Sequence, residues 1–256
     1  MKLGVLGLGE AGGAIAADAA AAGAAVRGWD PDPARDAPGI ERVTAPEEAA
    51  AGADAVLSVN AAVAALDAAH SVAARLAAGS VFADLNSAGP PLKRAVAEVV
   101  APSGAAFADV ALMGPVPRHG IRTPALASGP GAERFAELLR PLGMPVEVLG
   151  PEPGAAATRK LLRSVFMKGM AAAAIESLRA GQAAGCEEWV RAELAAALEA
   201  ADAALLERLV TGSERHAGRR VDEVNDACDL LEELGVEPRV ARAAGEWLTE
   251  LAATTR

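Results

Sequence analysis

Residues 1–30 read MKLGVLGLGEAGGAIAADAAAAGAAVRGWD, and two interpretations of this stretch compete. A lysine, an apolar run and a small-residue end are typical of a secretory signal peptide. The same stretch contains the run Gly7-Leu8-Gly9-Glu10-Ala11-Gly12, which has the GxGxxG spacing of a dinucleotide-binding turn. In the first interpretation the segment is cut away, whereas in the second it opens an α/β nucleotide-binding domain.

The residues around the glycines favour the dinucleotide-binding turn. Glu10 and Asp18 interrupt the charge-free apolar core that a signal peptide needs. LGVLG (3–7) predicts a short buried strand, a helix is predicted from Glu10 to Gly23, and AAVRGWD (24–30) predicts a second strand. Such a strand–turn–helix–strand unit holds a pyrophosphate at the helix N-terminus. We therefore expect the N-terminus to be retained.

Each glycine of the turn has a separate expected role. Gly7 permits the tight turn, Gly9 lets the pyrophosphate approach the backbone, and Gly12 lets the helix pack against the strand. Asp30 ends the second strand, where an acidic side chain accepts hydrogen bonds from the adenosine ribose. An acid there also repels the 2′-phosphate of NADP, and Pro31-Asp32 supplies no arginine. The sequence predicts a dinucleotide cofactor, with NAD favoured over NADP.

The composition of the chain narrows the class of protein. Hydrophobic residues make up 52% of the 256 residues, which excludes a disordered chain. The net charge of −10 is spread evenly and no basic stripe exists, so nucleic-acid binding is not expected. Two cysteines and three histidines lack the spacing of metal ligands, and no apolar run approaches the roughly 20 residues of a membrane span. We expect a cytoplasmic protein without a metal site or a membrane partner.

Strand and helix signals alternate along the first 150 residues and then stop. Further strands are predicted at 54–60, 80–86, 105–111, 124–129 and 144–150, with helices at 61–77, 89–100 and 131–140 between them. Beyond Gly150 the predicted helices are 154–184, 187–210, 213–234 and 238–253, with breaks near Gly185, Gly212 and Gly235. The predicted fold class is α/β. A Rossmann-type doubly wound parallel sheet over residues 1–150 is followed by an all-α domain over residues 151–256 that begins with a long interdomain helix.

A row of polar side chains on that interdomain helix is a second candidate for chemistry. Lys160, Ser164 and Lys168 are spaced i, i+4 and i+8, so they project from one face of the helix. Hydride transfer at a hydroxyl or carbonyl carbon needs a neighbouring group that gives or takes a proton. An ordinary lysine has a pKa of about 10.4, so a basic Lys160 needs desolvation or nearby positive charge, for which Arg163 and Lys168 are the local sources. We predict that this row forms the polar wall of a cleft.

The order of these motifs resembles the β-hydroxyacid dehydrogenase superfamily, which includes 3-hydroxyisobutyrate and 6-phosphogluconate dehydrogenases. GLGEAG (7–12) is similar to the family's GLGxMG turn, DLNSAGP (84–90) to its nicotinamide-side segment, and DVALMGP (109–115) to its substrate loop. GAAATRKLLRS (154–164) resembles the family signature in which a lysine is the catalytic acid/base. The resemblance implies that Lys160 is catalytic and that the helical domains interlock in a homodimer.

The motifs and the resemblance together predict the residues of a cofactor site and of a substrate site. The cofactor site is expected to consist of Gly7, Leu8, Gly9, Glu10, Ala11, Gly12, Asp30, Ser58, Val59, Asn60, Asn86 and Ser87. The substrate site is expected to include Met113, Gly114, Ser164, Lys168 and Arg219.

The chain departs from the superfamily at two substrate positions. Met113 replaces the substrate-loop serine, and Ser164 replaces the asparagine four residues after the signature lysine. A lesser-known phosphogluconate-dehydrogenase-like branch resembles the chain more closely, because it shares the MGP loop, the RSxFMKG helix and a segment like RHAGRR (215–220). In that segment Arg219 is a candidate clamp for a carboxylate or phosphate, and the alternative is a solvated face with ion pairs to nearby acids.

We therefore expect an NAD-dependent oxidoreductase, with NADP as second choice, that acts on the hydroxyl or carbonyl carbon of a small anionic substrate. Lys160 takes the hydroxyl proton during oxidation and returns one during reduction. Two alternatives remain open. One is an imine reductase on a related scaffold, in which aspartate or tyrosine generally replaces the lysine. The other is a non-catalytic dinucleotide-binding protein.

Overall fold

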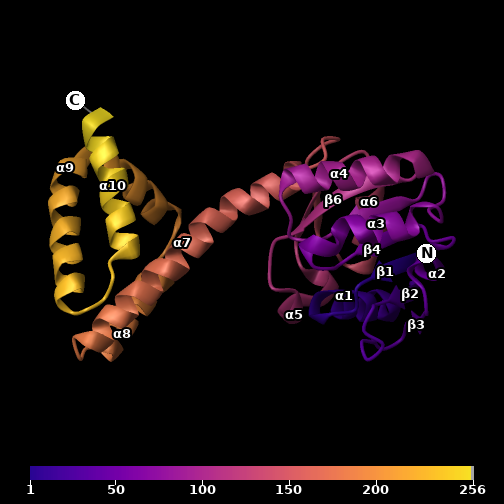
Figure 1. Ribbon diagram of the computed structural model, residues 1–256, viewed down its shortest axis with the longest axis horizontal. Coiled ribbons are helices and arrows are strands. Elements are labelled where there is room, and N and C mark those ends of the chain that lie inside the picture. The colour runs from indigo at the N-terminus through magenta and orange to yellow at the C-terminus, as the bar shows by residue number, and fades with distance from the viewer. Residues whose placement is uncertain (255–256) are drawn as a thin grey trace. The chain divides into compact units, whose positions relative to one another are not determined.

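The computed structural model describes residues 1–254 and divides into two compact units, of which the first is Met1–Arg163 and the second begins at Ser164. In the first unit an eight-stranded sheet carries helices on both faces (Figure 1). The strands are β1 (Lys2–Leu6), β2 (Ala25–Trp29), β3 (Glu41–Arg42), β4 (Ala55–Ser58), β5 (Val81–Asp84), β6 (Ala106–Leu112), β7 (Ala125–Ser128) and β8 (Val146–Val148). The helices are α1 (Glu10–Ala21), α2 (Pro46–Ala50), α3 (Ala65–Ala73), α4 (Pro90–Val100), α5 (Val116–His119) and α6 (Ala132–Leu139).

The strand order across residues 1–163 is β3-β2-β1-β4-β5-β6-β7-β8. Neighbouring strands are parallel in that range, apart from the antiparallel pair of β6 and β7. The register places Asp109 of β6 opposite Asp84, the last residue of β5, so β6 continues three residues past the end of its neighbour. The predicted doubly wound sheet is confirmed.

Side chains of alternating direction along the strands build two hydrophobic cores. Leu3 and Val5 of β1 pack in the core that includes Ile15 of α1 and Phe135 of α6. Leu6, the next residue along β1, points to the opposite face and belongs to the core under α2, α3 and α4. This two-residue period buries both faces of the sheet, as a parallel sheet requires.

The described residues of the second unit form helices joined by short turns, without a strand. The unit contains most of α7 (Ala155–Ala183), together with α8 (Glu187–Glu199), α9 (Ala203–Glu233) and α10 (Arg239–Thr254). The predicted single helix 187–210 is wrong, because the chain breaks before α9, where the Asp202 side chain accepts a hydrogen bond from the Leu205 N–H at 2.7 Å and caps the helix. The break predicted near Gly212 is displaced, because α9 continues through this glycine. Inside α9, His216 has non-helical backbone angles (φ −122°, ψ 24°) that kink the helix.

The first turns of α7 belong to the sheet unit. Ala156 and Ala157 are buried in it, and the division between the units falls after Arg163, although the last strand ends at Val148. The predicted domain boundary at residue 150 was based on where the strand signals stop, and such signals do not reveal that the first turns of α7 pack against the sheet. The consequence is that Lys160 lies in the same unit as the glycine-rich turn.

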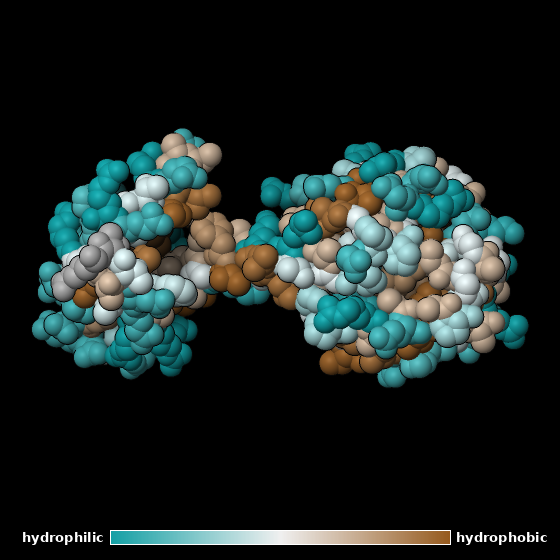
Figure 2. Space-filling model, turned by 90° about the horizontal axis from the view of Figure 1, so that it is seen from above, coloured by the Kyte–Doolittle hydropathy of each residue, from teal (hydrophilic) through white to brown (hydrophobic). Residues whose placement is uncertain are grey.

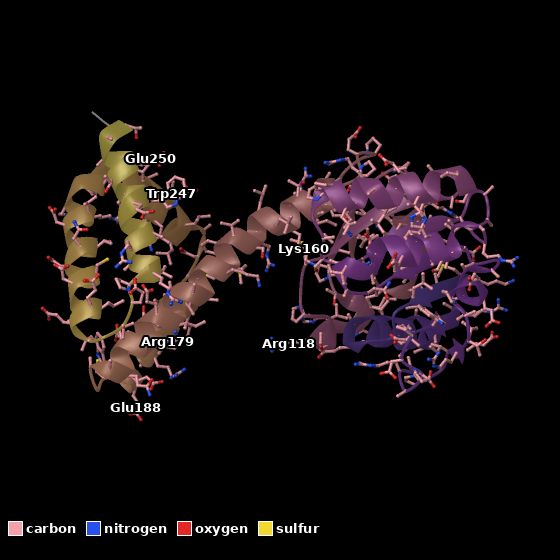
Figure 3. The ribbon with its side chains drawn as sticks, viewed as in Figure 1. Arg118, Lys160, Arg179, Glu188, Trp247 and Glu250 are labelled. Carbon is pink, nitrogen blue, oxygen red and sulfur yellow. The ribbon has the colours of Figure 1, made fainter. Side chains whose placement is uncertain are left out.

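The helices of the second unit bury few side chains. Within the described residues of α8, α9 and α10, Ala217 alone is buried. Trp189 of α8 and Trp247 of α10 are about two-thirds exposed, with Trp247 labelled in Figure 3. Figure 2 shows brown, apolar residues at the surface of α7 and of the helical unit. The Glu176 carboxylate joins α7 to α10 by accepting hydrogen bonds from the Val240 and Ala241 N–H groups at 2.8 and 2.9 Å.

Candidate functional site

The glycine-rich turn between β1 and α1 has the backbone geometry that its sequence predicts. Gly7 has φ +97°, a conformation that residues with a Cβ rarely adopt. A Cβ at Gly12 would clash with the carbonyl oxygen of Gly7, so this glycine sets the close packing of α1 on β1. Gly9 is the N-cap of α1, and a Cβ there would meet no heavy atom within 4 Å. The space beside Gly9 and the free N–H groups of α1 therefore suit a pyrophosphate.

Asp30 lies beside this turn and is bound to it. Its Oδ2 accepts a hydrogen bond from the Leu8 N–H at 2.7 Å, and its Oδ1 accepts one from the Asp32 N–H at 2.9 Å. A carboxylate oxygen can accept two hydrogen bonds, so Asp30 keeps acceptor sites for ribose hydroxyls. Arg35 was not among the predicted residues, yet it lines the same pocket and faces Asp32 with an Nε–Oδ2 distance of 3.6 Å.

A pocket of about 710 Å³ runs from the glycine-rich turn to Lys160. This volume lies in the range of small-molecule and cofactor sites. Of the predicted residues, the pocket is lined by Gly7, Gly9, Glu10, Ala11, Gly12, Asp30, Val59, Asn60, Asn86, Ser87, Gly114 and Lys160. Its apolar wall includes Leu85, Leu112 and Val116, which the sequence analysis did not assign. The residues present fit an extended dinucleotide.

Hydrogen bonds fix the polar side chains at the ends of β4 and β5. The buried Ser58 hydroxyl accepts from the amide nitrogens of Asn60 and Asn86 at 3.0 and 3.1 Å. The Asn60 N–H donates in turn to the Asn86 Oδ1. Ser58 itself does not line the pocket, and neither does the buried Leu8, so both support the wall from behind.

Lys160 lies in the first turns of α7 (Figure 3), and its partner Ser87 lies in the turn that follows β5. Its ammonium group donates a hydrogen bond to the Ser87 hydroxyl at 2.8 Å. Burial lowers the pKa of Lys160 below the ordinary value of a lysine, the charges of Lys93 and Arg163 lower it further, and Asp109 acts in the opposite direction. The two causes that sequence reasoning required, desolvation and nearby positive charge, are both present, although the main charge is Lys93 rather than Lys168.

A buried ionic cluster lies behind this wall and was missed. Lys93 of α4 is 1% exposed, and its Nζ lies 3.2 Å from Asp84 Oδ2 and 3.3 Å from Asp109 Oδ1. Lys93 occupies the buried face of α4 together with Val96 and Val100, at i, i+3 and i+7. A lysine on the apolar stripe of a helix is the signal that could have revealed a buried ion pair.

The predicted substrate residues are dispersed. Gly114 lines the pocket, whereas Met113 lines a separate hollow with Pro124 and Leu126, and its N–H donates to the Pro124 carbonyl at 2.7 Å. Ser164, Lys168 and Arg219 belong to the second unit. Arg219 is exposed and faces Glu223 of the same helix with an Nη1–Oε1 distance of 3.5 Å.

The loop that carries Gly114 is anchored to α1. The Asp18 carboxylate accepts a hydrogen bond from the Ile121 N–H at 2.9 Å. Gly120 has φ +55°, and a Cβ there would clash with this carboxylate. Asp18, which argued against a signal peptide, thus holds the loop in place.

Two features are absent from residues 1–254. No cluster of three or more His, Cys, Asp or Glu side chains that could hold a metal ion occurs among these residues. Over the same residues, no helix has the length and apolarity needed to cross a membrane.

The turn, Asp30 and the pocket together define a dinucleotide-binding Rossmann unit. Residues 2–144 match the family described as the NAD binding domain of 6-phosphogluconate dehydrogenase, and the chain belongs to this family of NAD(P)-binding oxidoreductases. Residues 182–251 match a domain of unknown function, DUF1932. The resemblance that the sequence motifs indicated is confirmed.

Known relatives support the fold over the whole length. A conserved hypothetical protein from Sinorhizobium meliloti 1021 is 31% identical, with 97% of this chain and 87% of that chain covered and a TM-score of 0.63. A conserved protein of unknown function, described as structurally similar to 3-hydroxyacid dehydrogenases, is 26% identical over 100% of both chains with a TM-score of 0.62. An imine reductase from Myxococcus stipitatus in complex with NADP+ shares the fold at 21% identity, with 99% and 95% of the two chains covered and a TM-score of 0.85.

A curated relative matches over a shorter range. An uncharacterized 28.5 kDa protein from Methanothermus fervidus is 28% identical over 148 residues, which are 56% of this chain. The match spans about half the length of that relative, 55%.

Proposed function

We propose that the protein is an NAD-dependent oxidoreductase that transfers a hydride between nicotinamide and the hydroxyl or carbonyl carbon of a small anionic, hydroxyacid-like substrate. The observation that carries this proposal is the Lys160 amine, which lies in the wall of the glycine-turn pocket 2.8 Å from the Ser87 hydroxyl. A half-buried lysine whose pKa is lowered, in the wall of a cofactor pocket, supports an acid/base role.

Lys160 acts as the acid/base group in this proposal. Nicotinamide, when bound, supplies or accepts the hydride. In the oxidative direction the neutral Lys160 amine takes the hydroxyl proton while the C–H bond breaks and the C=O bond forms. In the reductive direction the ammonium returns that proton to the carbonyl oxygen. Ser87 accepts a hydrogen bond from the ammonium and can donate one to the neutral amine, so it holds Lys160 in place in both states.

A preference for NAD over NADP follows from the charges around the adenosine end of the pocket. Asp30, Asp32 and Arg35 line this end, and the guanidinium of Arg35 already faces the Asp32 carboxylate. Two carboxylates against one guanidinium repel the phosphate that distinguishes NADP. We expect kcat/KM to be higher with NAD, and Asp30→Asn to narrow the difference. An NADP preference in the unaltered protein would refute this part of the proposal.

For the substrate site we propose the residues that the sequence predicted. Gly114 supplies a wall of the pocket, and Met113, Ser164, Lys168 and Arg219 remain candidates for substrate contacts, with Arg219 as the clamp for a carboxylate or phosphate. We also propose that the protein forms a homodimer through the helical unit, because its exposed tryptophans and leucines would be buried by a second copy. Light scattering after size-exclusion chromatography tests the dimer.

The experiment that tests the function is a thermal-shift and turnover screen with NAD, NADP and a panel of hydroxyacids. On a substrate found in this way, Lys160→Ala is expected to lower kcat by about 100-fold or more while NAD affinity is kept. Arg159→Ala is the matched control, because Arg159 is an exposed basic residue on the adjacent position of α7. Full turnover by Lys160→Ala would refute the assignment. Activity on cyclic imines but on no hydroxyacid would favour the imine reductase alternative.

A further inference from the structure

Lys93 forms ion pairs with two buried carboxylates, Asp84 at 3.2 Å and Asp109 at 3.3 Å. Its ammonium group also donates a hydrogen bond to the Asp84 backbone carbonyl at 2.8 Å. These three side chains are 1% exposed or less, and the lysine comes from α4 while the aspartates come from β5 and β6. Such a cluster costs desolvation energy, and well-packed apolar residues would often stabilise a fold as well or better. Stability alone therefore does not explain this buried ionic cluster.

The two carboxylates of the cluster hold the two sides of the Ser87–Lys160 contact. Asp84 Oδ1 accepts a hydrogen bond from the Asn86 N–H at 3.0 Å, which shapes the turn that carries Ser87. Asp109 Oδ2 accepts from the Gly154 and Ala157 N–H groups at 3.1 and 3.0 Å, at the N-terminus of α7. Lys160 follows Ala157 by one helical turn. Lys93 pairs with both aspartates and so links the two sides.

We propose that Lys93 is a positioning residue for Lys160, which acts through Asp84 and Asp109 to keep the turn that carries Ser87 and the helix that carries Lys160 in one arrangement. The proposal rests on the assignment of Lys160 as the acid/base group. It concerns α4 and the sheet rather than the pocket lining, because Lys93 does not line the pocket.

The buried charge has a second, electrostatic consequence. The charged groups that act on Lys160 are Lys93 on α4, Asp109 on β6 and Arg163 on α7 itself. Lys93 and Arg163 are the two positive charges that lower the pKa of Lys160. Loss of the Lys93 charge removes one of them, so the pKa of Lys160 would rise.

Amine labelling tests this without any substrate. The chain contains four lysines, namely Lys2, Lys93, Lys160 and Lys168. The labelling rate of each lysine with acetic anhydride is measured against pH by mass spectrometry of its peptide. In the unaltered protein Lys160 is expected to become reactive at lower pH than the exposed Lys168, which serves as the internal control. In Lys93→Met the labelling rate of Lys160 near pH 8 is expected to fall by roughly threefold or more relative to Lys168.

Two further variants distinguish the expected change in Lys160 labelling from the effect of a folding defect. Lys93→Met with Asp84→Asn removes an opposite pair and keeps the net charge of the cluster, so no unpaired charge is buried, and the same fall is expected. Arg94→Met removes an exposed positive charge from the next position of α4 and should leave Lys160 unchanged. Circular dichroism establishes that each variant is folded.

An unchanged Lys160 labelling profile in the folded double variant would overturn the proposal. Failure of the proposed function is distinguishable, because it would appear as turnover that is independent of Lys160 and would leave the labelling result intact.

Discussion

Replacement of Asp109 by alanine provides the sharpest test of how the first unit is held together. The carboxylate is 0% exposed and accepts three hydrogen bonds at 3.0–3.1 Å, from Gly154, Ala157 and Ser128, in addition to its ion pair with Lys93. The substitution leaves three buried donors without this acceptor and leaves the Lys93 ammonium with Asp84 alone. The Asp109→Ala substitution should therefore lower the free energy of unfolding far more than truncation of an exposed aspartate does.

The magnitude follows from the buried ion pair. Removal of one partner of such a pair typically costs 3–5 kcal/mol, so we expect a loss of about 4 kcal/mol in the free energy of unfolding. Domains are stable by about 5–15 kcal/mol, so the variant should remain folded but marginal. For a protein of this size the loss corresponds to a fall in Tm of about 8–16 °C.

The assay is urea unfolding followed by pulsed hydrogen exchange of the peptide that contains β5, which reports the first unit alone. Asp54→Ala is the matched control, because the exposed Asp54 carboxylate accepts a single backbone hydrogen bond, from the Lys2 N–H at 2.7 Å. We expect the control to lose less than about 1 kcal/mol. A loss of similar size in both variants would refute the argument that the cluster at Asp109 ties α7 to the sheet.

Three further outcomes are expected. Gly12→Ala should lower the Tm of the first unit, because the added Cβ clashes with the Gly7 carbonyl oxygen. Gly9→Ala should leave Tm unchanged and weaken NAD binding measured by calorimetry, because a Cβ there meets no protein atom. An equal loss of Tm in both variants would contradict this difference. Glu176→Ala should lower the stability of the helical unit by about 1–2 kcal/mol, because the N-terminus of α10 loses its cap, and an unchanged melting curve would contradict the role. The lowered pKa of Lys160 predicts that oxidation accelerates as pH rises through that pKa while reduction slows, and a midpoint at or above the ordinary lysine value in the pH–rate profile would contradict it.

Local patterns predicted the parts of the molecule that depend on neighbouring residues in the sequence. The GxGxxG spacing, the apolar strands and Asp30 are local signals, and the glycine conformations at Gly7 and Gly12 follow from sterics alone. The break before α9 was misplaced because Gly212 was given more weight than Asp202. Helices tolerate an interior glycine at a cost of about 1 kcal/mol, whereas an aspartate at the N-cap sets a start.

The rest of the candidate site depends on which elements meet. Lys93, Asp84 and Asp109 come from three elements, and nothing in the order of the motifs states that they share one buried space. Met113 directly precedes Gly114, but both residues lie beyond the end of β6, and the two residues line different hollows. The charge that acts on Lys160 was sought on its own helix, whereas the larger one comes from α4.

The position of the unit boundary has a consequence for synthesis of the protein. Every residue that lines the candidate pocket, Lys160 included, lies within Met1–Arg163. At the usual rate of 5–20 residues per second, residues 164–256 take about 5–20 seconds to translate. The nucleotide pocket can therefore assemble, and be stabilised by a dinucleotide, while the helical unit is still being made on the ribosome.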